Sequence, residues 1–268
     1  WRWWGILGHS WRHSLRKGKE LRKGPDPIRN YLNLTVVIYQ QSMTGVSSPQ
    51  LQPLSLAERA YDEIRRLIIR LDLAPGDVVR EADLQATLDM SRTPIREALQ
   101  RLARDHFVTV IPRRGMFVSA IEFDELAMLY ETRAIMEPYA ARLATKRGTG
   151  ADWDEMADVL AETALAGKTP EELLELDRQC HEIIWRASGN RFLTNTLDTL
   201  YAQSDRLWHM YLADVHDMGH AVDDHAAIHE ALQSGDAETV ANLIEDHVNS
   251  FDAQVRNAVT TRLAAPLA

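Results

Sequence analysis

Two residues of this sequence are spaced so that they could bind one metal ion. Asp177 and His181 stand four positions apart in residues 170–188, where the apolar pattern predicts a helix. Side chains at i and i+4 leave the same face of a helix about one turn apart. A carboxylate and an imidazole are both common ligands of divalent transition metals. The pair therefore predicts part of a metal site.

Two further histidines could complete this site, although spacing alone does not select them. His225 lies near the start of a later predicted helix and His247 in the middle of the last one. Three imidazoles and one carboxylate suit Zn, Ni, Mn or Fe, and they leave coordination positions for the oxygens of a small molecule. A single histidine is more often a surface or hydrogen-bonded residue than a ligand, and the same half of the chain also contains His209, His216, His220 and His229.

A second set of residues could bind DNA. Arg92, Thr93 and Arg96 fall in the first turns of a predicted helix over residues 91–105. Helix N-terminal amides and hydroxyls suit phosphate oxygens, and an arginine can donate two hydrogen bonds to guanine. Taken alone, these arginines fit an ordinary three-helix module with a solvated basic helix equally well.

The elements that would position these arginines lie within residues 55–120. Ser55 and Glu58 have the spacing of a capping box ahead of a helix that ends at Pro75-Gly76, and a short helix follows over about 81–88. Residues 107–119 change to strand periodicity and predict a β-hairpin with a basic tip at Arg113 and Arg114, turned by Gly115. Three helices followed by a two-stranded wing form the winged helix-turn-helix layout, and the tip could enter a minor groove.

The rest of the chain reads as helix. We expect a mainly α protein, with an N-terminal winged helix-turn-helix and a C-terminal all-α helical bundle. The domains are expected at 55–120 and 121–258, between an extension over 1–54 and a tail over 259–268. The predicted helices of the bundle are 122–146, 151–166, 170–188, 190–214, 218–233 and 236–258.

Residues 1–54 are expected to be unstructured or vector-derived. Tryptophans are scattered among basic residues there, the chain does not begin with methionine, and Met43 could open a natural N-terminus. The order of a signal peptide is absent, and an amphipathic membrane anchor is the less favoured alternative.

Composition limits the class of protein. Of the 268 residues, 45% are hydrophobic and 26% are charged, which is ordinary for a soluble globular protein. Cys180 is the only cysteine and no long apolar run occurs, so we expect a cytoplasmic protein without membrane spans. The net charge of −9 is uneven: residues 121–268 have 11 basic and 27 acidic residues, whereas 55–120 have 11 and 10. An acidic chain can still bind DNA through a locally basic surface.

A resemblance to a known family rests on three stretches of the sequence. They are Pro75-Gly76, Ser91-Arg92-Thr93-Pro94-Ile95-Arg96-Glu97-Ala98-Leu99 and Arg113-Arg114-Gly115-Met116-Phe117-Val118. With these stretches, the sequence closely resembles the GntR family of transcription regulators over essentially all of residues 55–120. The resemblance implies that the DNA contacts fall on Arg92, Thr93, Arg96, Arg114 and Gly115.

The acidic helical segment after such a domain resembles the FCD effector domain of the FadR-like subfamily. That resemblance implies a metal site at Asp177, His181, His225 and His247, all of which are present. It also implies that Arg133 points into an effector cavity, where a guanidinium can bind a carboxylate through two parallel hydrogen bonds. Asn195 and Arg206 are weaker candidates for effector binding, because a helix-surface salt bridge or cap would explain them as well.

These features predict a homodimeric regulator, expected to be a repressor, which binds a double-stranded operator under the control of a small organic acid. One rival is a metal-dependent hydrolase, but no accompanying motif such as His-Glu-x-x-His occurs. The other is a metal that is purely structural, with no organic effector. We therefore expect a regulator and not an enzyme.

Overall fold

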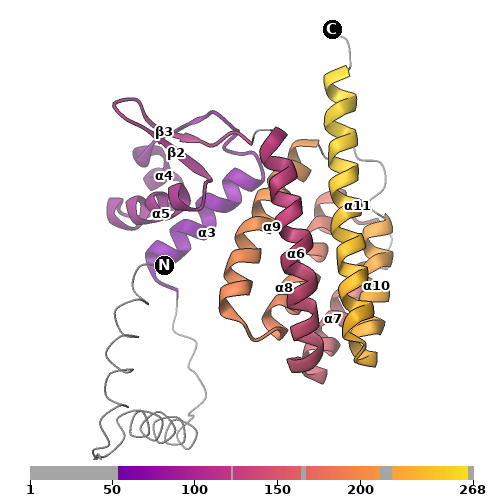
Figure 1. The fold of residues 1–268 in the computed structure, drawn as a ribbon. Helices are drawn as coiled ribbons and strands as arrows, with labels where there is room; N and C mark the ends of the chain where they lie inside the picture. Colours follow the sequence, from indigo (N-terminus) through magenta and orange to yellow (C-terminus); the bar gives the residue numbers. More distant parts are fainter. Residues whose placement is uncertain (1–53, 122, 164–166, 212–218, 265–268) are drawn as a thin grey trace, which may run out of the picture. The chain divides into compact units, whose positions relative to one another are not determined.

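A computed structural model describes residues 54–121, 123–163, 167–211 and 219–264 (Figure 1). Within these ranges the chain is mostly helical with one small sheet, and the predicted fold class is confirmed. Leu54 apart, the predicted extension over 1–54, including the alternative start at Met43, lies outside the described residues. His216 and the end of the predicted tail, 265–268, also lie outside the described residues.

The N-terminal part contains three helices and three short strands. The helices are α3 (Leu56–Ile69), α4 (Glu81–Leu88) and α5 (Arg92–Arg104), and the strands are β1 (Val78–Val79), β2 (Val108–Ile111) and β3 (Gly115–Val118). The Ser55 hydroxyl accepts the Glu58 N–H and the Glu58 carboxylate accepts the Ser55 N–H, so the predicted capping box starts α3. This arrangement exposes the first turns of α5 while its other face packs on α3.

The sheet adds one strand to the predicted hairpin. Strands β2 and β3 pair antiparallel with Ile111 opposite Gly115, and β1 pairs antiparallel with the outer side of β3. Strand β1 consists of two residues, which is too short for an alternating pattern to reveal. Behind the sheet and α5, the side chains of Ile64, Ile95 and Leu99 are completely buried.

The C-terminal part is a bundle of six described helices (Figure 1). The breaks between them follow the predicted turns, and Thr169 starts α8 with a second capping box ahead of Pro170. The last helix runs to Ala264 and so passes the expected limit at 258. The helices are α6 (Phe123–Arg147), α7 (Gly150–Thr163), α8 (Pro170–Ala187), α9 (Arg191–Tyr211), α10 (Gly219–Ser234) and α11 (Ala237–Ala264).

The bundle has an apolar core that surrounds a polar centre. Met156, Ile184 and Trp208 belong to one cluster of buried side chains drawn from different helices. Cys180 is buried in the same cluster. Among the described residues, no helix is both long and apolar enough to cross a membrane.

Candidate metal centre and DNA-reading helix

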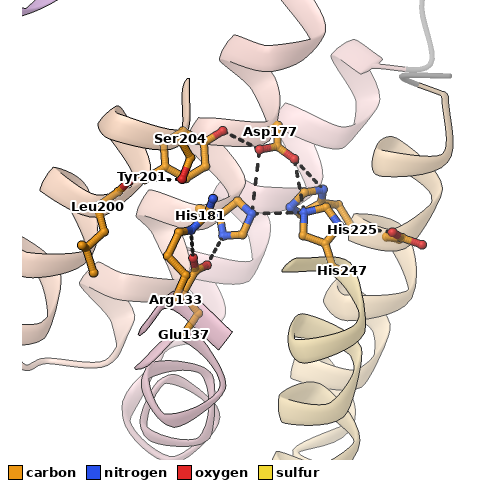
Figure 2. Close-up of polar contacts among 10 residues, drawn as sticks. Arg133, Glu137, Asp177, His181, Leu200, Tyr201, Ser204, His225 and His247 are labelled. Atoms are coloured by element: carbon orange, nitrogen blue, oxygen red, sulfur yellow. Dashed lines mark hydrogen bonds and ion pairs between the residues drawn. The ribbon is translucent and has the colours of Figure 1, made fainter. Parts of the chain in front are cut away.

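Asp177, His181, His225 and His247 meet inside the bundle, and we call this set the metal centre (Figure 2). Helix α8 contributes the aspartate and the first histidine, α10 contributes His225, and α11 contributes His247. One ligand atom from each lies within 4.8 Å of the others, and all four side chains are buried. Helix packing thus brings together residues that are far apart in the sequence.

Several distances within the metal centre match the separation of two ligands on one ion. Nε2 of His247 lies 3.2 Å from Nε2 of His181 and 3.4 Å from Oδ1 of Asp177. Nδ1 of His225 lies 3.6 Å from that same oxygen. Ligands bound at about 2.0–2.2 Å from one ion lie roughly 3–3.5 Å from each other. The four residues therefore fit a divalent transition metal with little rearrangement.

Opposite charges determine the protonation of the metal centre. Burial by itself would raise the pKa of Asp177, but the surrounding histidines outweigh it and hold that pKa well below its usual range. Burial would lower the pKa of His247, but the hydrogen bonds that its ring donates to Asp177 and Asp224 raise it to about 9. Without a metal, the aspartate is therefore ionised at neutral pH and His247 carries a proton.

Three residues that the sequence did not indicate contact the ligands from outside. Oε2 of Glu137 lies 2.7 Å from Nδ1 of His181, and Oδ2 of Asp224 lies 3.1 Å from Nδ1 of His247. The hydroxyl of Tyr201 donates to Oδ2 of Asp177 at 2.5 Å. Glu137 stands four positions after Arg133, and this helical spacing was the one signal that could have indicated it.

Arg133 lies beside the metal centre. Its guanidinium is almost fully buried, its Nε donates to Oε1 of Glu137 at 2.6 Å, and it lies 4.9 Å from the centre of the Tyr201 ring. Burial would lower the pKa of Arg133, but Glu137 outweighs it and raises that pKa. The cation is thus permanent and separated from His181 only by one carboxylate.

Asn195 and Arg206, unlike Arg133, do not lie beside the metal centre. On α9, Tyr201 faces the metal centre, and positions six before and five after it point roughly 120–140° away from that direction. Asn195 is exposed. Arg206 is buried and donates to the carbonyl oxygen of Ser119 and to Gln203, and burial lowers its pKa to about 10. No described contact joins either side chain to the metal centre.

The predicted DNA-reading residues are presented on the surface of the N-terminal part. Arg92, Thr93 and Arg96 are exposed at the start of α5 and line a shallow hollow of about 420 Å³. The hollow also includes Glu97 and Gln100. Ala98, Leu99 and Leu102 face the core, which leaves the opposite side of α5 available for DNA.

The hairpin carries the other residues that the sequence predicts to contact DNA. Arg114 is exposed at the turn, where its N–H donates to the carbonyl of Ile111 at 3.0 Å. Gly115 follows with φ of +110°, a backbone conformation that favours glycine over residues with a side chain. The turn therefore projects Arg114 away from the sheet.

Comparisons with known proteins agree with this architecture. Residues 56–118 match the family described as bacterial regulatory proteins, gntR family, and residues 128–250 match the FCD domain. The Nta operon transcriptional regulator of Aminobacter aminovorans is 31% identical over 191 residues, which cover 69% of this chain and 90% of the relative. The chain belongs to the GntR family. The HTH-type transcriptional repressor RspR of Escherichia coli K12 is 26% identical over 74% of this chain and 88% of its own length.

Solved structures show the same fold for this GntR-family chain. E. coli McbR/YncC superposes with a TM-score of 0.69 at 21% identity, covering 77% of this chain and all of McbR. A regulator from Rhodococcus sp. RHA1 gives 0.63 at 23% identity, covering 76% of this chain and 99% of the other. The chain is therefore a transcription regulator with a helix-turn-helix DNA-binding domain and an FCD domain, and not an enzyme, so the hydrolase alternative is wrong.

Proposed function

We propose that this GntR-family chain is a repressor whose affinity for its operator is controlled by a small carboxylate bound beside a divalent transition metal. The observation that carries the proposal is the buried set of Asp177, His181, His225 and His247, whose ligand atoms lie within 4.8 Å of one another. Buried charges are rare unless they pair or bind metals. A C-terminal domain that served only for dimerisation, without a metal, would not require three buried imidazoles around one carboxylate.

The same four residues would hold Zn, Ni, Mn or Fe, and the bound metal would supply positive charge that attracts an anionic effector. Arg133 supplies the second charge, because its guanidinium is buried, permanently cationic and one carboxylate away from His181. Two cationic groups in one buried region favour a small organic acid over a neutral metabolite.

Helix α9 offers a route from the metal centre to the DNA-binding domain. Tyr201 donates to Asp177, and one turn earlier Asp198 accepts two hydrogen bonds from Arg65 of α3, at 2.6 and 2.7 Å. Further along, Gln203 donates to the carbonyl oxygen of Asp105 at the end of α5. A ligand that favours one position of α9 would therefore also favour one position of the DNA-binding domain. The affinity for DNA would then change by as much as the ligand's affinity differs between the two positions.

We expect two chains to pair in the cytoplasm and to place two α5 helices on a two-fold symmetric operator. The DNA-binding half of the proposal is tested by operator binding of Arg92→Ala and Arg96→Ala. Each should weaken specific binding roughly 10- to 100-fold, since a bidentate base contact contributes about 1–3 kcal/mol of discrimination.

Arg59→Ala is the matched control, because Arg59 is an exposed arginine on α3 and not on α5. It should leave specific binding unchanged apart from a small electrostatic effect. Should both α5 variants keep wild-type affinity for the operator over random DNA, the assignment of α5 as the reading helix would be wrong.

The sensing half is tested by calorimetry with small dicarboxylates and hydroxy acids, on the metal-loaded chain and after chelation. We expect micromolar to millimolar binding that disappears on chelation and weakens in Arg133→Met. Indifference to every acid, with metal still bound, would favour the structural-metal alternative.

A further inference from the structure

We infer that Glu137 is a positioning residue of the metal centre: it holds His181 with Nδ1 protonated and Nε2 directed at the metal, and it ties that ring to Arg133. The inference rests on the proposed function in taking Asp177, His181, His225 and His247 as metal ligands. It adds Glu137, which contacts His181 and Arg133 (Figure 2).

Each carboxylate oxygen of Glu137 has its own partner. Oε2 lies 2.7 Å from Nδ1 of His181, and Oε1 accepts the Nε hydrogen of Arg133 at 2.6 Å. Both Glu137 and His181 are 1% exposed. Among the described residues, neither Oε2 nor Nδ1 has a hydrogen-bond partner outside this pair. Neither group can therefore turn to water or to another partner.

This geometry determines which nitrogen of His181 carries the proton. A neutral imidazole has one N–H and one lone pair, whereas an ionised carboxylate only accepts hydrogen bonds. The nitrogen beside Glu137 must therefore be the donor, and the lone pair falls on Nε2. That atom lies 3.2 Å from Nε2 of His247 and 3.8 Å from Oδ2 of Asp177, on the side where the metal would bind.

Arg133 keeps the carboxylate of Glu137 in this orientation. The two residues are one helical turn apart on α6, and the arginine binds the oxygen that His181 does not use. An effector carboxylate that binds Arg133 would consequently pull on the same group that orients a metal ligand. Metal affinity and effector affinity are thus linked through one side chain.

Asp224 stands in the same relation to His247 but in a different environment. Its Oδ2 lies 3.1 Å from Nδ1 of His247, yet the side chain is 44% exposed. Water can replace a partner at an exposed position, whereas it cannot reach Glu137. Of the two carboxylates, Glu137 should therefore have the larger effect on metal binding.

The first experiment compares metal affinity in Glu137→Gln and wild type by competition with a chelating dye, using Zn²⁺ and Co²⁺ alone. Glutamine keeps the shape of the side chain but offers only one acceptor, so it cannot serve both Arg133 and His181. We expect affinity to fall roughly 10- to 100-fold, the usual cost of losing a hydrogen-bond partner of a metal ligand. The visible Co²⁺ spectrum should also change, because the imidazole is no longer fixed.

Glu131→Gln is the matched control, since Glu131 is exposed on the same helix, and it should match wild type in both measurements. Asp224→Asn should weaken binding less than Glu137→Gln. Should Glu137→Gln bind both metals with wild-type affinity and an unchanged Co²⁺ spectrum, Glu137 would have no positioning role.

A second measurement needs no variant and covers the case in which Glu137→Gln does not fold. The ¹⁵N shifts of the His181 ring in the wild-type chain report its tautomer with and without Zn²⁺. We expect Nδ1 to carry the proton in both states and Nε2 to shift on metal binding; coordination through Nδ1 would overturn the inference. If the wild type bound no metal at all, the proposed function would be wrong as well. Metal binding through Nδ1 of His181 would contradict only the role of Glu137.

Discussion

The protonation states of His247 and Asp177 couple metal binding at the metal centre to proton release. His247 must be neutral to bind a metal, but its pKa is raised to about 9 when no metal is present. Asp177 has the opposite shift, to well below its usual range, and needs no proton change to act as a ligand. Metal and proton therefore compete for His247 at neutral pH.

We predict that metal binding at pH 7 releases a proton and that affinity rises about tenfold per pH unit until roughly pH 9. Calorimetry in buffers of different ionisation enthalpy measures the proton directly. His229→Gln alters a histidine that bonds to Trp153 outside the metal centre, so it should not change the result. Binding with equal heat in every buffer would contradict the prediction.

The same shifts fix the pH dependence of stability without metal. The pKa of His247 is raised on folding, so its contribution is full below the unfolded value near 6.5 and is lost as pH rises through about 9. The pKa of Asp177 is depressed, so its contribution is present above about pH 4 and is lost on acidification. The free energy of unfolding of the metal-free chain should therefore fall on both sides of neutrality.

The individual residues also show how far the sequence could lead. The i, i+4 spacing of Asp177 and His181 indicates their shared face from helical geometry alone. His225 and His247 came from the family resemblance, because periodicity says nothing about which helices pack together. Glu137 was missed because an acidic residue four positions from an arginine usually marks a surface ion pair, and only tertiary packing buries it.

Among the elements, α9 has contacts in both functional parts of the chain. Its Asp198 binds Arg65 of α3 through two hydrogen bonds, and this pair is only partly exposed. Burial would lower the pKa of Arg65, but Asp198 outweighs it and raises that pKa. The bidentate geometry makes this a directional contact rather than a general attraction.

We predict that Asp198→Asn leaves metal affinity unchanged but reduces the effect of metal and effector on operator binding. The reason is that asparagine lacks the charge and the second acceptor oxygen, so α9 loses its tie to α3. Operator titrations with and without metal measure the response, and chelator competition measures the affinity. Thr196→Ala, an exposed change on the same helix, is the control; an unaltered response in Asp198→Asn would remove α9 from the route.

The boundaries of elements were less predictable than their existence. The capping box at Ser55 indicated the start of α3 from local chemistry. The predicted end of the last helix at 258 was wrong, since α11 runs to Ala264 and no glycine or proline marks a stop near 258. Strand β1 exists only through its pairing with β3, which is a tertiary interaction.

For the whole molecule, one exposed face of α6 bears on assembly. Met128, Ile135 and Tyr139 recur at helical spacing and are 53–75% exposed. Monomeric soluble proteins rarely expose large contiguous apolar patches. This face supports the homodimer proposed above.

We predict that Ile135→Glu converts the dimer into monomers and weakens operator binding at least 10-fold, because each half-site must then be bound separately. Sedimentation velocity measures the mass of the free protein. Leu56→Glu adds the same charge at an exposed apolar residue of α3 and should leave the mass unchanged. A dimer that survives Ile135→Glu would place the interface elsewhere.

The single thiol of this chain has a practical consequence. Cys180 is 1% exposed beside His181, and burial raises the pKa of its thiol. A disulfide reagent such as DTNB can therefore react only when the bundle opens around α8, so its rate reports that opening without an introduced label. Metal should slow labelling by the factor 1 + [metal]/Kd, because the closed state alone assembles the four ligands. The labelling rate of Cys180 thus measures how often the helical bundle opens.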